Sequence, residues 1–469
     1  MAVQPALSFV RGSQAPIVAQ LREFVRFPSV GAQPKHNADV ARCAEWLAKH
    51  LRGLGMPRVR VMPTERHPIV RADWLKAPGR PTILIYGHYD VQPADPIDKW
   101  TTPPFGGEVR GENLFGRGAC DDKGQMFAHV KAIEALLRTR RALPVNVKCL
   151  FEGEEESGST SLLPFLKRHR DELAADVAAL SDSPMATLDR PAITYAMRGS
   201  LSLTLTVRGP SRDLHSGLFG GAIHNPLQAL SEIVASMHRS GRVAIEGFYD
   251  DVRDWGANER AFMARHGPSD AAILEQAGAE CGWGEAGYSL YERTTIRPAL
   301  TINGISGGYN GAGGKAVIPT VANAKVSFRL VPDQDPRKIE QLFQRHLRKV
   351  TPPTVRVAVK TEFMARPALI DRRHPVFRAA AFACRRGFGK PAAFLRCGGT
   401  IPVISMLKQQ LGVPVVLLGF GRPDARIHSP DERLHLPTFF KSVSTCIYFL
   451  TAAARMNAMQ ADRAREFAT

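Results

Sequence analysis

Hydrophobic positions in the N-terminal part of the chain alternate between helical spacing and short continuous runs. Apolar residues recur at helical spacing over 39–54 and from Met126 to Leu137, which predicts two helices, the second with Asp122 as a suitable N-cap residue. Residues 82–87 form an apolar run suited to a strand buried on both faces. Further runs predict buried strands at 145–151, 177–180 and 413–420. Because strands alternate with helices, we expect an α/β fold with a mostly parallel central sheet flanked by helices.

The pattern changes near Gly199. Residues 201–207 alternate between apolar and small or polar, which is the period of a half-buried strand. Five further features follow in this part: a helix at 226–237, a glycine-rich stretch at 304–315, a strand at 324–330, a helix at 336–350 and a strand at 355–360. A helical run at 376–386 resembles a return to the first pattern. We therefore predict an inserted α+β domain at 199–365, within a discontinuous domain made of 1–198 and 366–469, whose polar tail after Arg455 is expected to fray.

Composition narrows the classes of protein to consider. The net charge of +18 comes from short, scattered clusters of Lys and Arg without interleaved aromatic residues, so we predict no nucleic-acid partner. The N-terminus lacks the apolar core of a signal peptide, and no apolar stretch reaches about 18 residues, so secretion and membrane spanning are not predicted. The seven cysteines are scattered without a C-x-x-C pair, which fits a reducing, cytoplasmic location.

Five segments place metal-binding side chains just beyond the predicted strands. They carry His88 and Asp90, Asp121 and Asp122, Glu152 to Glu156, Asp182, and His428. In an open α/β sheet, ligands bind at the carboxyl ends of the strands, where these segments should meet. Two imidazoles together with three or more carboxylates suit zinc, with manganese or cobalt as substitutes. The sequence therefore predicts a metal centre at this edge of the sheet.

The number of carboxylates is sufficient for two metal ions. A pair of ions needs a shared ligand, and a carboxylate can bridge because it has two oxygens. Ions about 3.5–4 Å apart lower the pKa of a water bound between them and polarise a scissile carbonyl. A further carboxylate must then accept the proton of that water. The run Glu154-Glu155-Glu156 can supply both a ligand and this base if the strand has ended, which Gly153 and Gly158 favour.

Five motifs occur in the order known from one family of enzymes. They are Gly-His-Tyr-Asp-Val-Gln-Pro from Gly87, Gly-Arg-Gly-Ala-Cys-Asp-Asp-Lys-Gly from Gly116, Glu-Gly-Glu-Glu-Glu-Ser-Gly-Ser from Glu152, Arg-Gly-Ser from Arg198, and His-Ser-Pro-Asp-Glu from His428. The chain thus resembles the two-metal exopeptidases that include carnosinase, aminoacylase, succinyl-diaminopimelate desuccinylase and glutamate carboxypeptidase. Through residues 213–217, 311–313 and 398–402 it is most similar to the cytosolic dipeptidase and carnosinase branch.

The resemblance implies a set of metal ligands. His88, Asp121 and Asp182 would hold one zinc ion of each subunit, and Asp121, Glu156 and His428 the other. Asp121 would bridge the two ions. The family usually has a cis peptide after this aspartate, here Asp121-Asp122.

The same resemblance implies the catalytic groups. Glu155 matches the general base, and Asp90 matches the carboxylate that orients His88. The chain departs from the branch at Glu154, where a neutral residue is common. Glu154 and Glu155 therefore stay open as an alternative pair of base and ligand.

Substrate binding is implied mainly in the inserted domain. His215, Arg329 and the loop Gly398-Gly399-Thr400 match positions that hold the substrate carboxylate or the developing oxyanion, where a donor contributes about 3–4 kcal/mol. Arg396, beside that loop, is a weaker candidate. By resemblance, the inserted domain forms a homodimer and closes over the substrate, with His215 acting in the partner's active site. The implied reaction is amide hydrolysis in a small peptide with a free carboxylate, most closely by a dipeptidase; N-acyl amino acid deacylation or glutamate-type carboxypeptidase activity is the alternative.

Two readings from other classes compete with this one. Gly304-Ile305-Ser306-Gly307-Gly308 fits the G-x-S-x-G pattern of serine hydrolases, but a glycine-rich stretch follows where a helix is required. A metal-stabilised binding protein would use the same ligands without turnover, but it would not need a base such as Glu155.

Overall fold

The computed structural model describes residues 3–456, which form two compact units. The first consists of the segment that ends at Tyr195, of Ile370–Leu395 and of the segment that begins at Met406. The second consists of Ala196–Leu369 and Arg396–Ser405. The sequence placed the change of domain at 198/199 and 365/366 and did not foresee that the chain enters the second unit again at Arg396. The tail predicted to fray lies, from residue 457 on, outside the described residues.

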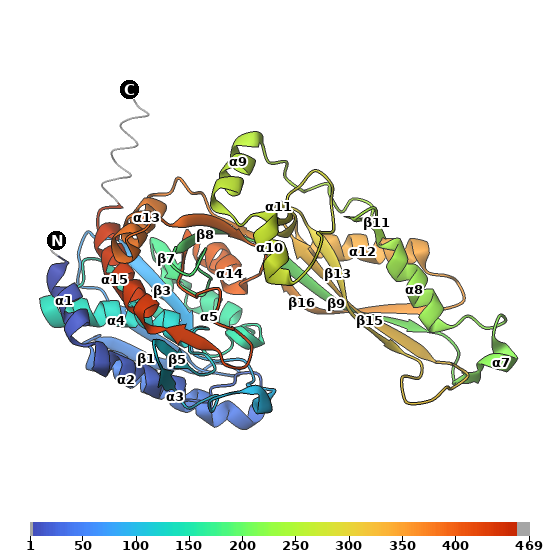
Figure 1. Ribbon diagram of the computed structural model, residues 1–469, viewed down its shortest axis with the longest axis horizontal. Coiled ribbons are helices and arrows are strands. Elements are labelled where there is room, and N and C mark those ends of the chain that lie inside the picture. Colours follow the sequence, from blue (N-terminus) through green and yellow to red (C-terminus); the bar gives the residue numbers. More distant parts are fainter. Residues whose placement is uncertain (1–2, 457–469) are drawn as a thin grey trace. The chain divides into compact units, whose positions relative to one another are not determined.

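A mixed β-sheet forms the centre of the first unit (Figure 1). Its strands follow in space the order β1 (Arg58–Met62), β2 (Ile69–Trp74), β6 (Asn146–Glu152), β3 (Thr82–His88), β7 (Val177–Leu180), β19 (Val415–Gly419), β8 (Ala192–Met197) and β17 (Ala368–Leu369), and β18 (Ala393–Cys397) also pairs with β8. The four strands from β6 to β19 are parallel, and the pairs on either side of them are antiparallel. β7 and β19 are buried throughout, as their continuous apolar runs predicted.

Helices supply the covering layers of the first unit. They are α1 (Gln4–Gly12), α2 (Gln14–Val25), α3 (Asn37–Gly53), α4 (Lys123–Arg140), α5 (Leu162–Arg168), α6 (Arg170–Leu173), α13 (Pro375–Phe388) and α15 (Leu436–Ala453), and α14 (Pro402–Leu411) begins in the second unit. α4 packs against β3 and against α15, which in turn packs against α13. A small sheet joins β4 (Glu108–Arg110), β5 (Asn113–Phe115) and β20 (Arg433–His435). The α/β class predicted from the sequence is confirmed.

The second unit has an antiparallel sheet and a core of its own. Its strands follow the order β13 (Ala299–Gly307), β15 (Val321–Leu330), β9 (Gly199–Arg208) and β16 (Arg356–Ala365). Alternate residues of β9 point into a core that α8 (Pro226–Ser236) and α12 (Pro336–Val350) help to form. Its other elements include α7 (Ser216–Phe219), α9 (Ala257–His266), α10 (Asp270–Ala277), α11 (Leu290–Thr295) and the short strands β10 (Leu214–His215), β11 (His238–Arg239), β12 (Arg242–Val243) and β14 (Val317–Ile318). The alternating pattern predicted this α+β arrangement.

The G-x-S-x-G pattern does not form a nucleophile elbow. Gly304 to Gly307 belong to β13, and the next regular element is the strand β14. An elbow requires a sharp turn from a strand into a helix, with the serine at the turn. The structure thus removes the serine-hydrolase reading.

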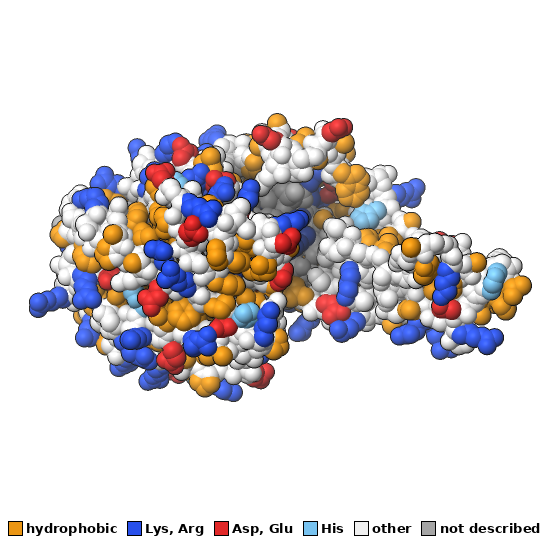
Figure 2. Space-filling model, turned by 60° about the horizontal axis from the view of Figure 1, so that its bottom comes forward, with side chains coloured by type: hydrophobic (Ala, Val, Ile, Leu, Met, Phe, Trp, Pro, Cys, Tyr) orange, Lys and Arg blue, Asp and Glu red, His pale blue; other side chains and the backbone are white. Residues whose placement is uncertain are grey.

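The apolar character of the helices and the distribution of charge on the surface test whether the chain could meet a membrane or a nucleic acid. Among residues 3–456, none of the helices combines the length and the apolar character needed to cross a bilayer. Figure 2 shows Lys and Arg side chains scattered over the face in view, among acidic and hydrophobic ones. On this face the net positive charge does not gather into one patch.

A half-buried histidine gives the first unit a pH-dependent stability. His50 on α3 lies 3.1 Å from Nζ of Lys131 on α4, and burial together with the Lys131 charge lowers the pKa of His50 to about 3. The unfolded chain binds a proton at this histidine below a pKa of about 6.5, whereas the folded chain resists it. The stabilisation is therefore complete above that pH and is lost as the pH falls. We expect the free energy of unfolding to drop by about 2 kcal/mol between pH 7 and pH 5 from this group.

Urea unfolding of the protein and of a His50→Gln variant at both pH values measures this contribution. The variant keeps an acceptor for Lys131 but does not titrate. Between pH 7 and pH 5, the free energy of unfolding of the wild type should fall by about 2 kcal/mol more than that of the variant. An equal fall in both proteins would contradict the assignment.

Candidate metal centre

The strand ends deliver the predicted metal ligands to one edge of the central sheet. His88 is the last residue of β3 and pairs with Glu152, the last residue of the parallel neighbour β6. Asp182 lies two residues beyond the end of β7, and His428 follows β19 after a loop. Because these strands run in parallel, their carboxyl ends lie along the same edge, as the sequence predicted.

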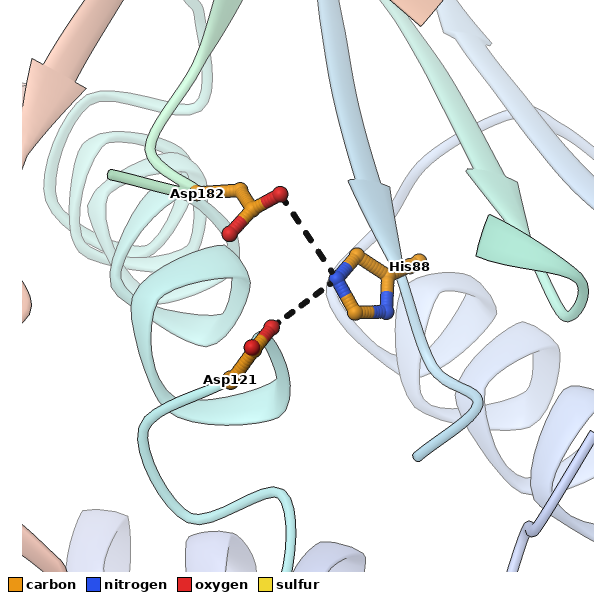
Figure 3. A group of neighbouring side chains, drawn as sticks. All are labelled: His88, Asp121 and Asp182. Carbon is orange, nitrogen blue, oxygen red and sulfur yellow. Dashed lines mark ion pairs between the residues drawn. The ribbon is translucent and has the colours of Figure 1, made fainter. Parts of the chain in front are cut away.

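One group of ligands consists of His88, Asp121 and Asp182 (Figure 3). Nε2 of His88 lies 3.1 Å from Oδ1 of Asp121 and 3.9 Å from Oδ2 of Asp182. The imidazole of His88 is fully buried. Its nitrogen therefore faces two carboxylates from two other segments of the chain.

A second group shares Asp121 with the first and adds Glu156 and His428. Nε2 of His428 lies 3.0 Å from Oδ2 of Asp121 and 3.1 Å from Oε1 of Glu156. The two oxygens of Asp121 thus face different imidazoles, Oδ1 toward His88 and Oδ2 toward His428. This is the geometry that a carboxylate bridging two cations requires.

The donor set fits a pair of divalent cations. Nε2 of His88 is buried and has no hydrogen-bond partner among residues 3–456, although two carboxylates lie near it. A buried polar atom without a partner is rare because its desolvation is uncompensated. Imidazole nitrogens with carboxylate oxygens are the ligands that zinc takes in hydrolytic sites. The residues present can therefore hold two such ions, with Asp121 between them.

Electrostatics shows that the cluster attracts positive charge. Burial raises the pKa of Asp182 to about 7, and the charge of Asp121 acts in the same direction. Hydrogen bonds to Asp121 and Glu156 raise the pKa of His428 to about 10. Burial would raise the pKa of Asp121, but the nearby imidazoles of His428 and His88 hold it below its usual range. The crowded carboxylates thus favour bound protons, which metal cations would replace.

Asp90 connects His88 with the glutamate segment. Its carboxylate accepts hydrogen bonds from the backbone N–H of Glu155 at 3.2 Å and of Glu156 at 3.1 Å. Nδ1 of His88 lies 3.2 Å from the Asp90 carbonyl oxygen and 3.5 Å from its Oδ1. A Cβ on Gly31 would lie 2.8 Å from Oδ2 of Asp90, so only glycine fits beside this carboxylate. Asp90 therefore orients both an imidazole and the segment that carries a metal ligand.

The three consecutive glutamates occupy different surroundings. Oε1 of Glu154 accepts a hydrogen bond from the His67 N–H at 2.9 Å, and its Oε2 accepts bonds from Thr160 at 2.9 Å and the Ser161 N–H at 3.1 Å. Glu154 is buried with these partners and anchors the loop. Glu155 and Glu156 follow in a short 3₁₀ turn, Glu155–Ser157, and Glu156 belongs to the second ligand group. This geometry favours Glu155 and Glu156, rather than Glu154 and Glu155, as the pair at the centre.

The start of α4 differs in one respect from its prediction. The peptide Asp121-Asp122 is cis, as the resemblance implied. Asp122 does occupy the N-cap position of α4, but its side chain makes no capping hydrogen bond. Its Oδ2 instead accepts a bond from the backbone N–H of His88 at 3.3 Å. The carboxylate is used to join the Asp121 segment to β3, and this long-range contact could not be inferred from the local pattern.

The predicted substrate-binding residues lie in the second unit. Arg329 on β15 is half-buried, and its Nη1 donates to Oγ1 of Thr400 at 2.9 Å. Thr400 in turn donates to the carbonyl oxygen of Arg198 at 2.7 Å, and Gly399 is exposed beside it. The second unit thus brings Arg329 and the Gly398-Gly399-Thr400 loop together.

Arg396 and His215 have opposite surroundings within this unit. Arg396 is buried, with its guanidinium 3.9 Å from the centre of the Trp255 ring and 2.7 Å from Oε1 of Glu259. Its charge is therefore engaged within the unit. His215 is exposed, and its Nδ1 accepts a hydrogen bond from the Gly217 N–H at 3.0 Å.

Comparison with known proteins identifies the family. The family model described as Peptidase family M20/M25/M40 matches residues 84–455. The chain belongs to this family. This M20-family peptidase is 32% identical over 449 residues to the Cys-Gly metallodipeptidase dug1 of Schizosaccharomyces pombe. The alignment covers 92% of this chain and 94% of that relative. The chain is 29% identical over 481 residues to the human Beta-Ala-His dipeptidase, with 97% and 93% covered.

Solved structures agree with the family assignment. The M20 family metallo-carboxypeptidase Sso-CP2 from Sulfolobus solfataricus superimposes with a TM-score of 0.85 at 30% identity, covering 93% of this chain and 99% of that one. The resemblance drawn from the motifs is thus confirmed, and this M20-family peptidase is a metallopeptidase. Its membership favours an enzyme over the reading as a metal-stabilised binding protein without activity.

Proposed function

We propose that this M20-family peptidase hydrolyses dipeptides that carry a free carboxylate, at a centre of two zinc ions held by the two ligand groups. The observation that carries the proposal is the bridging geometry of Asp121, whose two oxygens face His88 and His428. When bound, the ions polarise the scissile carbonyl and lower the pKa of the attacking water. Zinc fits the imidazole and carboxylate donors best, and manganese or cobalt would substitute for it.

Glu155 is the general base of this proposal. Its half-buried carboxylate belongs to the turn whose N–H groups Asp90 holds, next to the ligand Glu156. Burial raises the pKa of Glu155 well above its usual value; the His88 charge opposes this shift, and Asp182 adds to it. A carboxylate of raised basicity can accept the proton of the attacking water and return it to the leaving amine nitrogen.

The second unit would hold the substrate carboxylate and the oxyanion. Arg329 is half-buried, and its guanidinium donates a hydrogen bond to the neutral hydroxyl of Thr400. A guanidinium placed beside a hydroxyl and an exposed glycine loop offers several donors to an incoming carboxylate. We assign this role to Arg329, Gly399 and Thr400, and give Arg396 the smaller role of supporting the loop from its buried position.

The two dipeptidase relatives favour dipeptides over the alternatives. Each covers more than nine-tenths of the chain and is named for cleavage of a dipeptide, Cys-Gly in one case and β-Ala-His in the other. Deacylation of N-acyl amino acids and glutamate-type carboxypeptidase activity are therefore not favoured.

A hydrolysis screen tests the proposed substrate class. Dipeptides, N-acyl amino acids and longer peptides are offered to the protein, with zinc, manganese and cobalt supplied in turn. We expect turnover of dipeptides, complete loss of that turnover with a strong chelator, and its return when the metal is added back. Activity that survives chelation, or that is confined to N-acyl amino acids, would contradict the proposal.

The second unit is also the proposed homodimer surface. Leu218 and Phe219, on α7 directly after His215, are exposed by 77% and 37%. Exposed apolar side chains of this size beside a polar functional group are typical of interaction sites. In such a dimer, His215 would act in the active site of the partner subunit.

Mixing two inactive variants tests this arrangement. His215→Ala removes the group that acts in the partner, and Glu155→Ala removes the base, so a mixed dimer retains one complete site. Activity should therefore return when the two variants exchange subunits. Full exchange, shown by size or by label transfer, without any return of activity would place His215 in the site of its own chain.

A cytoplasmic location completes the proposal. The seven cysteines all lie in the described part of the chain and form no disulfide there, and five of them are buried. A reducing compartment preserves such thiols.

A further inference from the structure

Glu432 is the last residue of the motif that begins with the ligand His428, and it is fully buried. Neither ligand group contains it. Its Oε1 accepts hydrogen bonds from the backbone N–H of Cys120 at 2.9 Å and of Asp121 at 3.0 Å. Its Oε2 accepts one from the N–H of Gly118 at 3.0 Å. One carboxylate therefore binds three N–H groups of the segment that presents Asp121.

The charge of Glu432 is compensated inside the protein. Nη1 of Arg117 donates to Oε2 of Glu432 at 2.7 Å, and both side chains are at most 1% exposed. The guanidinium also lies over the Trp100 ring, 5.4 Å from its centre. A buried ion pair contributes little net stability compared with apolar residues of similar volume, yet removal of one partner leaves an uncompensated buried charge. General stability therefore does not explain why this ion pair lies against the Asp121 segment. A role in holding that segment does explain it.

The backbone around Glu432 ties the same two segments together. The carbonyl oxygen of Glu432 accepts a bond from the Gly116 N–H at 3.0 Å, and β20, which begins at the next residue, pairs with β5. Gly118 adopts a φ of 79°, which favours glycine, so the segment before Asp121 is a tight turn with its N–H groups directed at one acceptor. The segment that supplies His428 thus also fixes the segment that supplies Asp121.

We infer that Glu432 is a positioning residue of the metal centre, which holds the bridging carboxylate of Asp121 in place through the backbone of Gly118, Cys120 and Asp121. The inference rests on the two-ion centre of the proposed function and adds a group that acts on both ions. Residues that orient a metal ligand through hydrogen bonds typically change metal affinity by about 10–100-fold when replaced. A displaced Asp121 would weaken both ions at once, because it belongs to both ligand groups.

Glu432→Gln tests this role with little change of shape. Each carboxylate oxygen of Glu432 faces N–H donors, so either orientation of the amide turns an NH₂ group toward a donor. We expect the dissociation constant for Zn²⁺, measured by competition with a chelator, to rise about 10–100-fold. Glu112→Gln is the matched control. Glu112 is 74% exposed beside the same pair of strands, where it pairs with His435, and its replacement should leave the affinity unchanged.

Melting temperatures with and without Zn²⁺ separate positioning from general stability. Because a ligand stabilises the folded state according to its affinity, Glu432→Gln should lose most of the stabilisation that Zn²⁺ gives to the wild type. An unchanged Zn²⁺ affinity, or an equal loss of melting temperature in the metal-free and zinc-loaded forms, would overturn the inference. If Glu432→Gln yields no folded protein, Glu432→Asp, which keeps the charge but retracts it by one methylene, should show the same loss of affinity to a smaller degree, and wild-type affinity in that variant would likewise overturn it.

This test does not depend on turnover. If dipeptides are not hydrolysed but Glu432→Gln weakens Zn²⁺ binding as expected, the proposed function is contradicted and this inference stands. If dipeptides are hydrolysed but Glu432→Gln leaves Zn²⁺ binding unchanged, this inference is contradicted and the proposed function stands.

Discussion

Replacing Glu155 by Gln is expected to lower kcat by about 10²–10⁴-fold, which is the usual contribution of a general acid–base group. The amide has nearly the same shape as the carboxylate but cannot accept a proton. Glu155 is not among the ligands of either group, so the zinc content should stay at the wild-type level. Steady-state kinetics on the best dipeptide, together with zinc analysis of the same sample, measures both quantities.

Glu154→Gln is the control that distinguishes the two registers of base and ligand. Glu154 is held by hydrogen bonds from His67 and Ser161, so its replacement should lower the melting temperature and reduce kcat far less than Glu155→Gln. If Glu154 were the base and Glu155 a ligand, Glu154→Gln would instead cause the larger loss of kcat, and Glu155→Gln would lose zinc. Unchanged turnover in Glu155→Gln would reject the mechanism altogether.

Asp121→Asn should remove the bridge and with it the activity. An amide oxygen is a weaker ligand, and the nitrogen beside it cannot coordinate, so at most one of the two imidazoles still faces an oxygen of residue 121. The ions supply several kcal/mol of transition-state stabilisation, so kcat/KM should fall by at least about 10³-fold, or about 4 kcal/mol. After dialysis against metal-free buffer, the zinc content should fall well below that of the wild type.

Asp182→Asn provides the comparison for this variant. Asp182 belongs only to the group with His88, so its replacement should weaken one ion and leave the other bound. Retention of both ions by Asp121→Asn, under conditions in which Asp182→Asn loses one, would show that Asp121 does not bridge.

The sequence predicted the four parallel strands of the central sheet because they are buried on both faces, but it did not predict β1, β2 or β8. Continuous apolar runs at 82–87, 177–180 and 413–420 correspond to β3, β7 and β19, with ends shifted by at most a few residues. Parallel strands place their carboxyl ends at one edge, so residues that follow them in the sequence converge in space. This is why His88 and His428 could be assigned to one centre although the chain between them is long.

Contacts formed only by the folded chain could not be predicted in this way. Arg396 is followed by a loop that resembles a substrate site, yet Trp255 and Glu259 from another segment enclose its guanidinium. Glu432 carries no local sign of its three backbone partners, and a lone glycine at position 31 gives no indication that Asp90 lies beside it. In each case the deciding partner is far away in the sequence, and no periodicity or short motif encodes it.

The gathering of ligands around two ions is tested most directly by X-ray diffraction from zinc-soaked crystals at the zinc absorption edge. The anomalous map should show two peaks about 3.5–4 Å apart, one bound by His88 and Asp182 and the other by Glu156 and His428, with Asp121 contacting both. A single peak, or two peaks of which neither lies against Asp121, would contradict the account.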